Sequence, residues 1–287
     1  GGGGDGDPHW ESVNLLLLGN GADEGTTITD SSSNSFTISR DSTGVTTSTD
    51  QKKEGTASIE FDSGASYIYA AHDAAFDFGA GDFTIESWIY NKMGGAVFNL
   101  VSKSTGNTNG WMFGLWNNHL EWVWVNNHEG SDTVPKNQWV HIAVSRSSGT
   151  GRMFIDGTED SGGSWEFTAN ADGGAAPLRV GYHAMHASGY KFYGWMDGLR
   201  ITKGVGRYTS SFTPATTFPT SVNAVGGPSS IFPDAFVDAS DVDVAPETIS
   251  EAVYGMPPEP PPDASGPADV EPPPEAPVYG MPGSPGE

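Results

Sequence analysis

The richest group of side chains with binding chemistry lies in residues 111–128, where four tryptophans stand among asparagines and histidines. An aromatic ring stacks on the C–H face of a sugar, and an asparagine amide both donates and accepts hydrogen bonds with hydroxyl groups. Asn117-Asn118-His119 separates two aromatic segments and is typical of a hairpin turn, because asparagine tolerates a positive φ. The pattern predicts a sugar-binding hairpin with the candidate residues Trp111, Trp116, Asn117, Asn118, His119, Trp122 and Trp124.

The same tryptophans have a second possible role, which is to fill the core. If residues 120–125 form a strand, alternation puts Trp122 and Trp124 on one face and Glu121 on the other. One of these faces has to pack inside the protein, where large aromatic residues usually lie. Four tryptophans in one hairpin still favour at least one exposed ring. A second aromatic group in residues 182–193 would line the same rim, with the candidates Tyr182, His183 and Tyr190.

The cluster Glu-x-Asp-x-Glu, which would place carboxylates for glycoside hydrolysis on one face of a strand, does not occur in this sequence. A retaining glycosidase holds two carboxyl groups about 5 Å apart, and an inverting one holds them somewhat further apart. Residues two apart on a strand share a face, but Glu86, Glu121 and Glu166 have no acidic residue at that spacing. Neither a nucleophile elbow nor a cysteine is present. The sequence therefore predicts a protein that is not an enzyme.

These side chains have to be positioned by β-strands. Residues 7–220 consist of short segments rich in valine, isoleucine, threonine and aromatic residues, separated by glycine, asparagine, aspartate and serine. No window has the apolar stripe of a helix. The pattern predicts an all-β, antiparallel two-sheet sandwich with Trp88 and Trp139 in its core. The predicted strands are 13–18, 58–62, 66–70, 83–91, 96–102, 111–116, 120–125, 138–146, 151–156, 164–168, 177–182 and 191–202.

Four motifs carry a resemblance to a known family. They are Asp7-Pro8-His9-Trp10 before residues 13–18, Gly81-Asp82-Phe83-Thr84-Ile85-Glu86-Ser87-Trp88-Ile89, Trp139-Val140-His141-Ile142-Ala143-Val144-Ser145-Arg146 with Met153-Phe154-Ile155-Asp156-Gly157, and Gly194-Trp195-Met196-Asp197-Gly198-Leu199-Arg200 continuing to Tyr208 and Phe212-Thr213-Pro214. In this order they resemble the laminin-G-like modules of the concanavalin A-like lectin/glucanase superfamily, in the variety common in phage structural proteins and bacterial surface proteins. The resemblance covers about residues 7–220 and implies a jelly-roll sandwich.

The resemblance also implies a structural calcium ion, because relatives often hold one between the first and last strands. The matching positions are the loop of residues 20–23 and Asp197. Oxygen-rich loops suit this hard cation, and Asp62 at the end of a predicted strand is a further candidate. Asp197 stands in an Asp-Gly corner and can equally well serve only as a turn residue. The calcium candidates are Asn20, Asp23, Asp62 and Asp197.

The chain is strongly acidic, with a formal net charge of −23. Such a surface repels nucleic-acid phosphates, so nucleic acid is not an expected partner. The acidity serves solubility, or else it reflects calcium binding or repulsion from cell-surface polyanions. No apolar segment approaches the roughly 18 residues of a membrane span, so no membrane contact is expected. Residues 1–6 are interpreted as a glycine-rich linker.

The composition changes at residue 221. Residues 221–287 hold 15 of the 20 prolines and 12 acidic residues but no lysine or arginine. This composition cannot offset the entropy of ordering and predicts an extended or disordered tail. Val-Tyr-Gly-Met-Pro occurs at 253–257 and again at 278–282, either as a docking motif or by duplication drift. As a docking motif it would bind a partner through Tyr254, Met256, Tyr279 and Met281.

Two functional hypotheses follow. The first is a non-catalytic module on a virion surface, outside the cell, that binds glycans or cell-surface polysaccharide in many copies or as a homo-oligomer. The alternative is a capsid or tail decoration module that binds other virion proteins through the tail.

Overall fold

The computed structural model describes residues 6–62, 66–92, 98–104, 110–123, 126–182 and 191–221. The chain divides into two units, Gly1–Ser230 and Ile231–Glu287, and all described residues belong to the first. No helix among them is long and apolar enough to cross a membrane. Their elements are η1 (Trp10–Ser12), β1 (Val13–Leu17), β2 (Ile38–Arg40), β3 (Val45–Ser48), β4 (Ser58–Phe61), β5 (Ile68–Ala70), η2 (Ala74–Phe76), β6 (Phe83–Asn91), β7 (Phe98–Ser104), β8 (Gly110–Trp116), β9 (His119–Val123), β10 (His128–Thr133), β11 (Trp139–Ser147), β12 (Thr150–Ile155), β13 (Thr158–Glu159), β14 (Trp165–Glu166), β15 (Leu178–Val180) and β16 (Gly194–Lys203).

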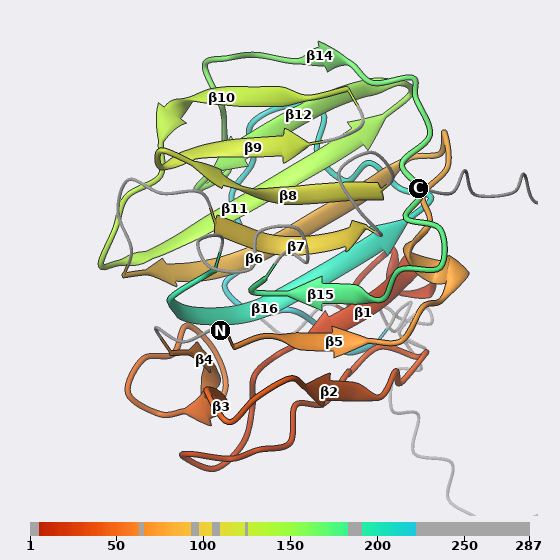
Figure 1. The fold of residues 1–287 in the computed structure, drawn as a ribbon. Helices are drawn as coiled ribbons and strands as arrows, with labels where there is room; N and C mark the ends of the chain where they lie inside the picture. Colours follow the sequence, from red (N-terminus) through yellow and green to blue (C-terminus); the bar gives the residue numbers. More distant parts are fainter. Residues whose placement is uncertain are drawn as a thin grey trace, which may run out of the picture. The chain divides into compact units, whose positions relative to one another are not determined.

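The described strands form two antiparallel sheets, as the sequence predicted (Figure 1). The sheet named here sheet 1 has the order β13-β12-β11-β6-β16-β4-β3, with β1 beside β16 and β14 beside β12. Sheet 2 has the order β10-β9-β8-β7-β15-β5-β2. Buried side chains from both sheets pack into one core cluster, so the molecule is a β-sandwich.

Each predicted strand overlaps an observed one, and the observed strands that were not predicted are β2, β3, β10 and β13. These four stand at the ends of the two strand orders. An edge strand pairs on one side only, so it tolerates polar residues and lacks a clear apolar alternation. The sequence of β10, His-Glu-Gly-Ser-Asp-Thr, is an example.

Sheet 2 contributes alternate side chains of β8 and β9 to the core. Trp111, Phe113 and Leu115 of β8 are buried, as are Leu120 and Trp122 of β9. The rings of Trp111 and Trp122 stack with their centroids 5.7 Å apart and their planes 9° apart. Most of the large side chains of the aromatic hairpin therefore pack in the core.

A second, smaller apolar cluster lies on the outer face of sheet 1. It consists of Val13, Leu16, Trp88 and Phe218. The indole of Trp88 donates to the carbonyl of Ala215 at 3.0 Å, and the amide of Asp7 donates to the carbonyl of Ser221 at 2.8 Å. The segment before β1 and the segment after β16 thus cover this face. Trp88 is buried as predicted but in this outer cluster, and Trp139 is only half-buried beside it.

Candidate functional site

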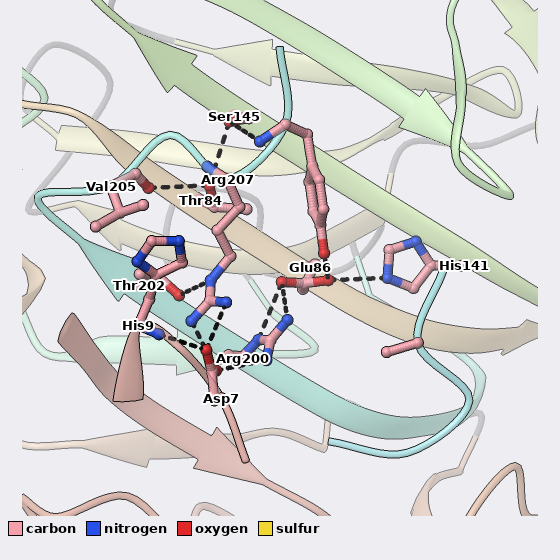
Figure 2. A network of polar contacts seen from close by, with 12 residues as sticks. Asp7, His9, Thr84, Glu86, His141, Ser145, Arg200, Thr202, Val205 and Arg207 are labelled. Carbon is pink, nitrogen blue, oxygen red and sulfur yellow. Dashed lines mark hydrogen bonds and ion pairs between the residues drawn. The ribbon is translucent and has the colours of Figure 1, made fainter. Parts of the chain in front are cut away.

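Glu86 of β6 is the centre of a buried polar network on the outer face of sheet 1 (Figure 2). Arg200 of β16 donates from Nε and Nη2 to Glu86 Oε1 at 3.0 and 2.8 Å. The other oxygen, Oε2, accepts from the hydroxyl of Tyr208 at 2.7 Å and lies 3.1 Å from Nε2 of His141. Burial alone raises the pKa of Glu86, but the charge of Arg200 and these hydrogen bonds hold it well below its usual range.

Asp7 extends the network to the segment before β1. Its Oδ2 accepts from Nη1 of Arg200 at 2.7 Å, and Arg207 donates to both carboxylate oxygens at 2.9 and 2.8 Å. Burial raises the pKa of Asp7, and the hydrogen bonds from Arg207 and His9 together with the charges of both arginines lower it further than burial raises it. These ionic groups compensate one another inside the fold, and the network joins β6 and β16 to the segment before β1.

The members of this network come from all four sequence motifs that carry the family resemblance. Asp7 belongs to the first motif, Glu86 to the second, His141 to the third, and Arg200 to the fourth. The motifs therefore encode the closure of the sandwich around its last strand. They do not by themselves encode a ligand site.

The turn between β8 and β9 brings four of the predicted sugar-binding residues together. Asn117 and Asn118 have φ angles of 49° and 69°, as expected for asparagines at a hairpin turn. Trp116 is 39 % exposed, the one large hydrophobic side chain that is exposed among the described residues. Nδ1 of His119 lies 3.1 Å from the carbonyl oxygen of Asp132, which ties the turn to β10.

Trp111 and Trp122 fill the core, the second of the two roles that the sequence allowed, because both are 0 % exposed. Alternation along β8 and β9 turns them inward and turns Trp116 outward. They are unavailable to a sugar. The remaining candidates Trp124, His183, Tyr190, Tyr254, Met256, Tyr279 and Met281 lie outside the described residues.

Tyr182 belongs to a group of tyrosines beside β5. Its ring stacks on Tyr67 with centroids 4.8 Å apart and planes 15° apart, and Tyr69 lies 6.1 Å from Tyr67. Arg179 of β15 pairs with Tyr69 in the strand register, so the two side chains share a face. All four side chains are half-buried. Sequence reasoning missed Tyr67, Tyr69 and Arg179, because only the pairing of β5 with β15 brings them to Tyr182.

The tyrosine group and Trp116 lie on the same face of sheet 2. Arg179 pairs with Ser102 of β7, which pairs with Met112 of β8. Trp116 follows Met112 by four residues on β8 and therefore points to the same side. This face is the outer one, because Trp111 and Phe113 point into the core from the alternate positions. Aromatic rings thus stand at two places on the outer face of sheet 2, and the residues Ser102 and Met112 between them are buried.

Two glutamates also oppose each other on this face. Glu121 of β9 pairs with Glu129 of β10 and, on its other side, with Gly114 of β8. Burial, followed by the charge of Glu129, raises the pKa of Glu121 to about 7. The sequence reasoning compared positions within single strands and missed this pair, because its partner comes from an edge strand that was not predicted.

The predicted calcium ligands serve as hydrogen-bond acceptors. Asn20 Oδ1 accepts from the amide of Thr56 at 2.7 Å, and Asp23 Oδ1 accepts from the amide of Thr49 at 2.9 Å. Asp62 accepts from the hydroxyl of Ser66 at 2.9 Å, and Asp197 accepts from the amides of Lys53 and Glu54 at 2.8 and 3.0 Å. Within the described ranges no three histidine, aspartate or glutamate side chains gather as a metal site would require. Calcium binding by this set stays a prediction.

The comparisons with known proteins agree with this architecture. The family model described as the concanavalin A-like lectin/glucanases superfamily matches residues 62–205, half of the chain. A comparison with the curated proteins gave no match.

Several solved structures share the fold at low identity. The binding domain of Paraclostridial Mosquitocidal Protein 1 has a TM-score of 0.54 at 18 % identity, over 68 % of this chain and 50 % of that chain. Domain 4 of AbnA, a GH43 extracellular arabinanase from Geobacillus stearothermophilus in complex with arabinotriose, has a TM-score of 0.51 at 17 % identity, over 67 % of this chain and 93 % of that chain. Botulinum neurotoxin type C, whose cell entry depends on two ganglioside molecules, has a TM-score of 0.52 at 14 % identity, over 69 % and 49 %.

This chain spans about half the length of the two toxin chains that it matches, so the likeness concerns one sandwich and not a whole toxin domain. The matched residues include β5 to β16, which contain most of both sheets, the second and third motifs, and the strand of the fourth motif. The chain belongs to the concanavalin A-like lectin/glucanase superfamily and has its lectin-like sandwich fold.

Proposed function

We propose that the sandwich is a carbohydrate-binding module whose ligand lies on the outer face of sheet 2. The observation that carries this proposal is Trp116, 39 % exposed on a hairpin turn of defined geometry. A ring that is already oriented loses little entropy when a pyranose stacks on it. The tyrosines and Arg179 on the same face supply further stacking and hydrogen-bonding groups.

Two similar structures support a sugar as the ligand. The arabinanase domain is in complex with arabinotriose, and the neurotoxin depends on gangliosides for cell entry. Both share the sandwich architecture with this chain. A shallow sheet face binds a single sugar weakly, with a Kd on the order of 0.1–1 mM. Binding to a cell surface would then depend on many copies of the module acting together.

The proposed module binds its glycan without cleaving it. Glu121 and Glu129 oppose each other on the outer face of sheet 2, where a partly protonated glutamate both donates and accepts hydrogen bonds to sugar hydroxyls. Release of reducing ends from a glycan that binds the module, together with loss of this release in Glu121→Gln, would show that the pair is catalytic instead.

The proposed location is the surface of a phage virion. The support is the resemblance of the four motifs to modules of phage structural proteins, together with the excess of acidic residues. A cryo-EM map of the parent particle, with density for this sandwich on the outer surface, would test the location. Density for the sandwich inside the capsid would exclude it.

The binding site is tested by a glycan array with the module displayed in many copies. The double variant Trp116→Ala, Asn118→Gly should lose binding while its Tm stays close to that of the wild type, because Trp116 lies outside the core and glycine tolerates the positive φ of residue 118. Trp139→Ala is the matched control, since this half-buried tryptophan lies on the outer face of sheet 1 and should leave binding intact. Failure of the multivalent wild type to bind any glycan or bacterial surface would remove the support for this function.

The tail sequence favours a second candidate function. The repeated Val-Tyr-Gly-Met-Pro segments at 253–257 and 278–282 are suited to docking on other virion proteins. In that case a sandwich truncated before the repeats should no longer join the particle. A truncated chain that is incorporated normally would exclude this role.

A further inference from the structure

Three aromatic side chains form a row across the outer face of sheet 1. Trp139 of β11 pairs with Tyr90 of β6, and Tyr90 pairs on its other side with Trp195 of β16. The ring centroids of Trp139 and Tyr90 lie 5.9 Å apart, and those of Tyr90 and Trp195 lie 5.3 Å apart. The row faces away from the core, because the adjacent residues along the three strands point into it. These adjacent residues are Ile89, Val140 and Met196.

Lys92 extends the aromatic row just after the end of β6. Its amide donates to the carbonyl of Tyr193 at 3.0 Å. Its ammonium lies 4.3 Å from the ring centre of Trp195 and 4.8 Å from that of Tyr193. The side chain is exposed, and no carboxylate of the described residues forms an ion pair with it. A positive charge held over two rings is therefore available to an anionic group.

The indole N–H of Trp195 is a second donor that lacks a partner. Its Nε1 atom is buried and has no acceptor in the part of the chain that the structure describes, and Trp195 as a whole is 5 % exposed. A buried N–H without an acceptor costs free energy, which a bound acceptor would restore. This nitrogen belongs to the ring over which the ammonium of Lys92 lies, so both donors are at one place. The flexible stem of the lysine can move aside for a ligand.

A similar pair of a lysine and an indole lies on the same face, in the cluster that is already covered. The ammonium of Lys53 lies 3.7 Å from the centre of the Trp88 ring. The indole of Trp88 donates to the carbonyl of Ala215 at 3.0 Å. The segment that supplies this carbonyl contains Pro214 and Pro219. On this face of the sandwich, a peptide segment with prolines thus already serves as the acceptor for one indole.

We propose that the aromatic row and Lys92 bind a proline-rich segment of another protein that carries a carboxylate. Such a segment adopts an extended polyproline II conformation, exposes its carbonyls and packs its rings on aromatic side chains. One carbonyl would accept from the indole of Trp195, as the carbonyl of Ala215 does from Trp88. The carboxylate would pair with Lys92. This site is separate from the proposed glycan face on sheet 2.

NMR titration of the full chain with the peptide acetyl-Pro-Pro-Pro-Glu-Pro-Pro-amide tests the site directly. The indole N–H signal of Trp195 is assigned by its absence in Trp195→Phe. We expect this signal to move downfield as the peptide is added, because the N–H gains an acceptor. A Trp195 signal that does not respond to the peptide would overturn the proposal. So would a signal that responds to a glycan and not to the peptide, which would make the row a sugar site.

Affinities of the variants assign the two contacts. Lys92→Met should weaken peptide binding about two- to fivefold, the effect of an exposed ion pair. A peptide with glutamine in place of glutamate should bind the wild type equally weakly and should lose nothing further in Lys92→Met. Trp195→Phe keeps a ring and should weaken binding about two- to tenfold. Lys53→Met is the matched control and should bind as the wild type does, because the indole of Trp88 already has its acceptor.

Lys92 is exposed, so Lys92→Met should keep the Tm of the wild type, and its loss of affinity then cannot come from unfolding. An equal effect of the glutamine peptide on the wild type and on Lys92→Met would overturn the pairing of the carboxylate with Lys92. Analytical ultracentrifugation tests the choice of partner. Self-association of the wild type that Lys92→Met lacks would mean that the row joins copies of this chain, and it would exclude another protein as the occupant.

Discussion

Arg200 is the residue on which the closure of sheet 1 depends most. It donates to Glu86 and to Asp7, and so it connects β16 with β6 and with the segment before β1. Both carboxylates are buried, with 1 % and 2 % of their residue surface exposed. If the guanidinium of Arg200 is removed, both carboxylates stay buried and lose their shared charged donor.

Arg200→Met should therefore lower the free energy of unfolding by about 3–5 kcal/mol, the usual effect of removing one partner of a buried ion pair. Arg152→Met is the control, because Arg152 and Glu159 are 3.4 Å apart with side chains 22 % and 29 % exposed. The free energy of unfolding of Arg152→Met should fall by less than about 1 kcal/mol. Urea denaturation measures both, and equal losses would show that the network does not close the sheet.

Glu121 makes a pH-dependent contribution to stability. Its pKa is raised to about 7 by burial and by Glu129, and a glutamate in an unfolded chain titrates near about 4.3. The folded state thus binds this proton more tightly. The resulting stabilisation is fully present below the unfolded pKa and is lost as the pH rises through about 7.

In Glu121→Gln, the decline in stability between about pH 4.3 and pH 7 should be shallower than in the wild type. Glu129→Gln should produce part of the same change, because it removes the second cause of the raised pKa. Urea midpoints at a series of pH values measure the three proteins. Parallel curves for wild type and both variants would refute the assignment.

At the scale of the element, two glycines with nearly the same φ differ in their surroundings. Gly157 in the predicted Asp-Gly turn between β12 and β13 has a φ of 74°, and Gly163 has a φ of 75°. A Cβ on Gly157 would collide with the carbonyl oxygen of Phe212, whereas a Cβ on Gly163 would have no atom within 4 Å. Only the first turn is packed against the segment that covers sheet 1.

Gly163→Ala should therefore lower the free energy of unfolding by about 1–2 kcal/mol, which is the effect of a positive φ alone. Gly157→Ala should lower the free energy of unfolding by about 1–3 kcal/mol more than Gly163→Ala does, because the backbone around Phe212 has to move. Chemical denaturation of the two variants isolates the packing contribution, since their φ angles match. Equal losses would mean that the contact with Phe212 contributes nothing.

The elements that the sequence could not predict share one property. Interior strands such as β6 and β11 are buried on both sides and carry several large apolar residues, so they can be recognised from the sequence alone. The edge strand β10 carries five polar residues in six, so its pairing with β9 depends on the hairpin geometry rather than on its own sequence. Because β10 was missed, Glu129 was missed as the partner of Glu121.

At the scale of the whole molecule, the fold and the family could be predicted from four motifs, but the proposed binding face could not. The motif residues meet in a buried network, so they report on packing. Trp116 could be named from its place in the hairpin, and the structure then separated it from Trp111 and Trp122. The tyrosine group and the pair Tyr90 and Trp195 join residues more than 100 positions apart, which no local spacing reveals.

The sandwich should fold without the tail. A chain that ends at Ser230 should unfold with the same Tm as the full chain, because the residues removed are rich in acidic side chains and proline and poor in apolar ones. Differential scanning calorimetry of the two chains measures this. A Tm lower by more than about 4 °C, or roughly 1 kcal/mol, would show that the tail stabilises the sandwich.

The hydrogen bond between Asp7 and Ser221 has a mechanical consequence. The polypeptide enters and leaves the sandwich at one spot, so a pull between its two flanking segments does not stretch the sheets end to end. The load falls first on this bond and then on the contacts of Asp7 with Arg200 and Arg207. The covering segments would peel away one contact at a time while the strands stay paired. In a sandwich attached in this way, the force between the two flanking segments does not pass through the paired strands.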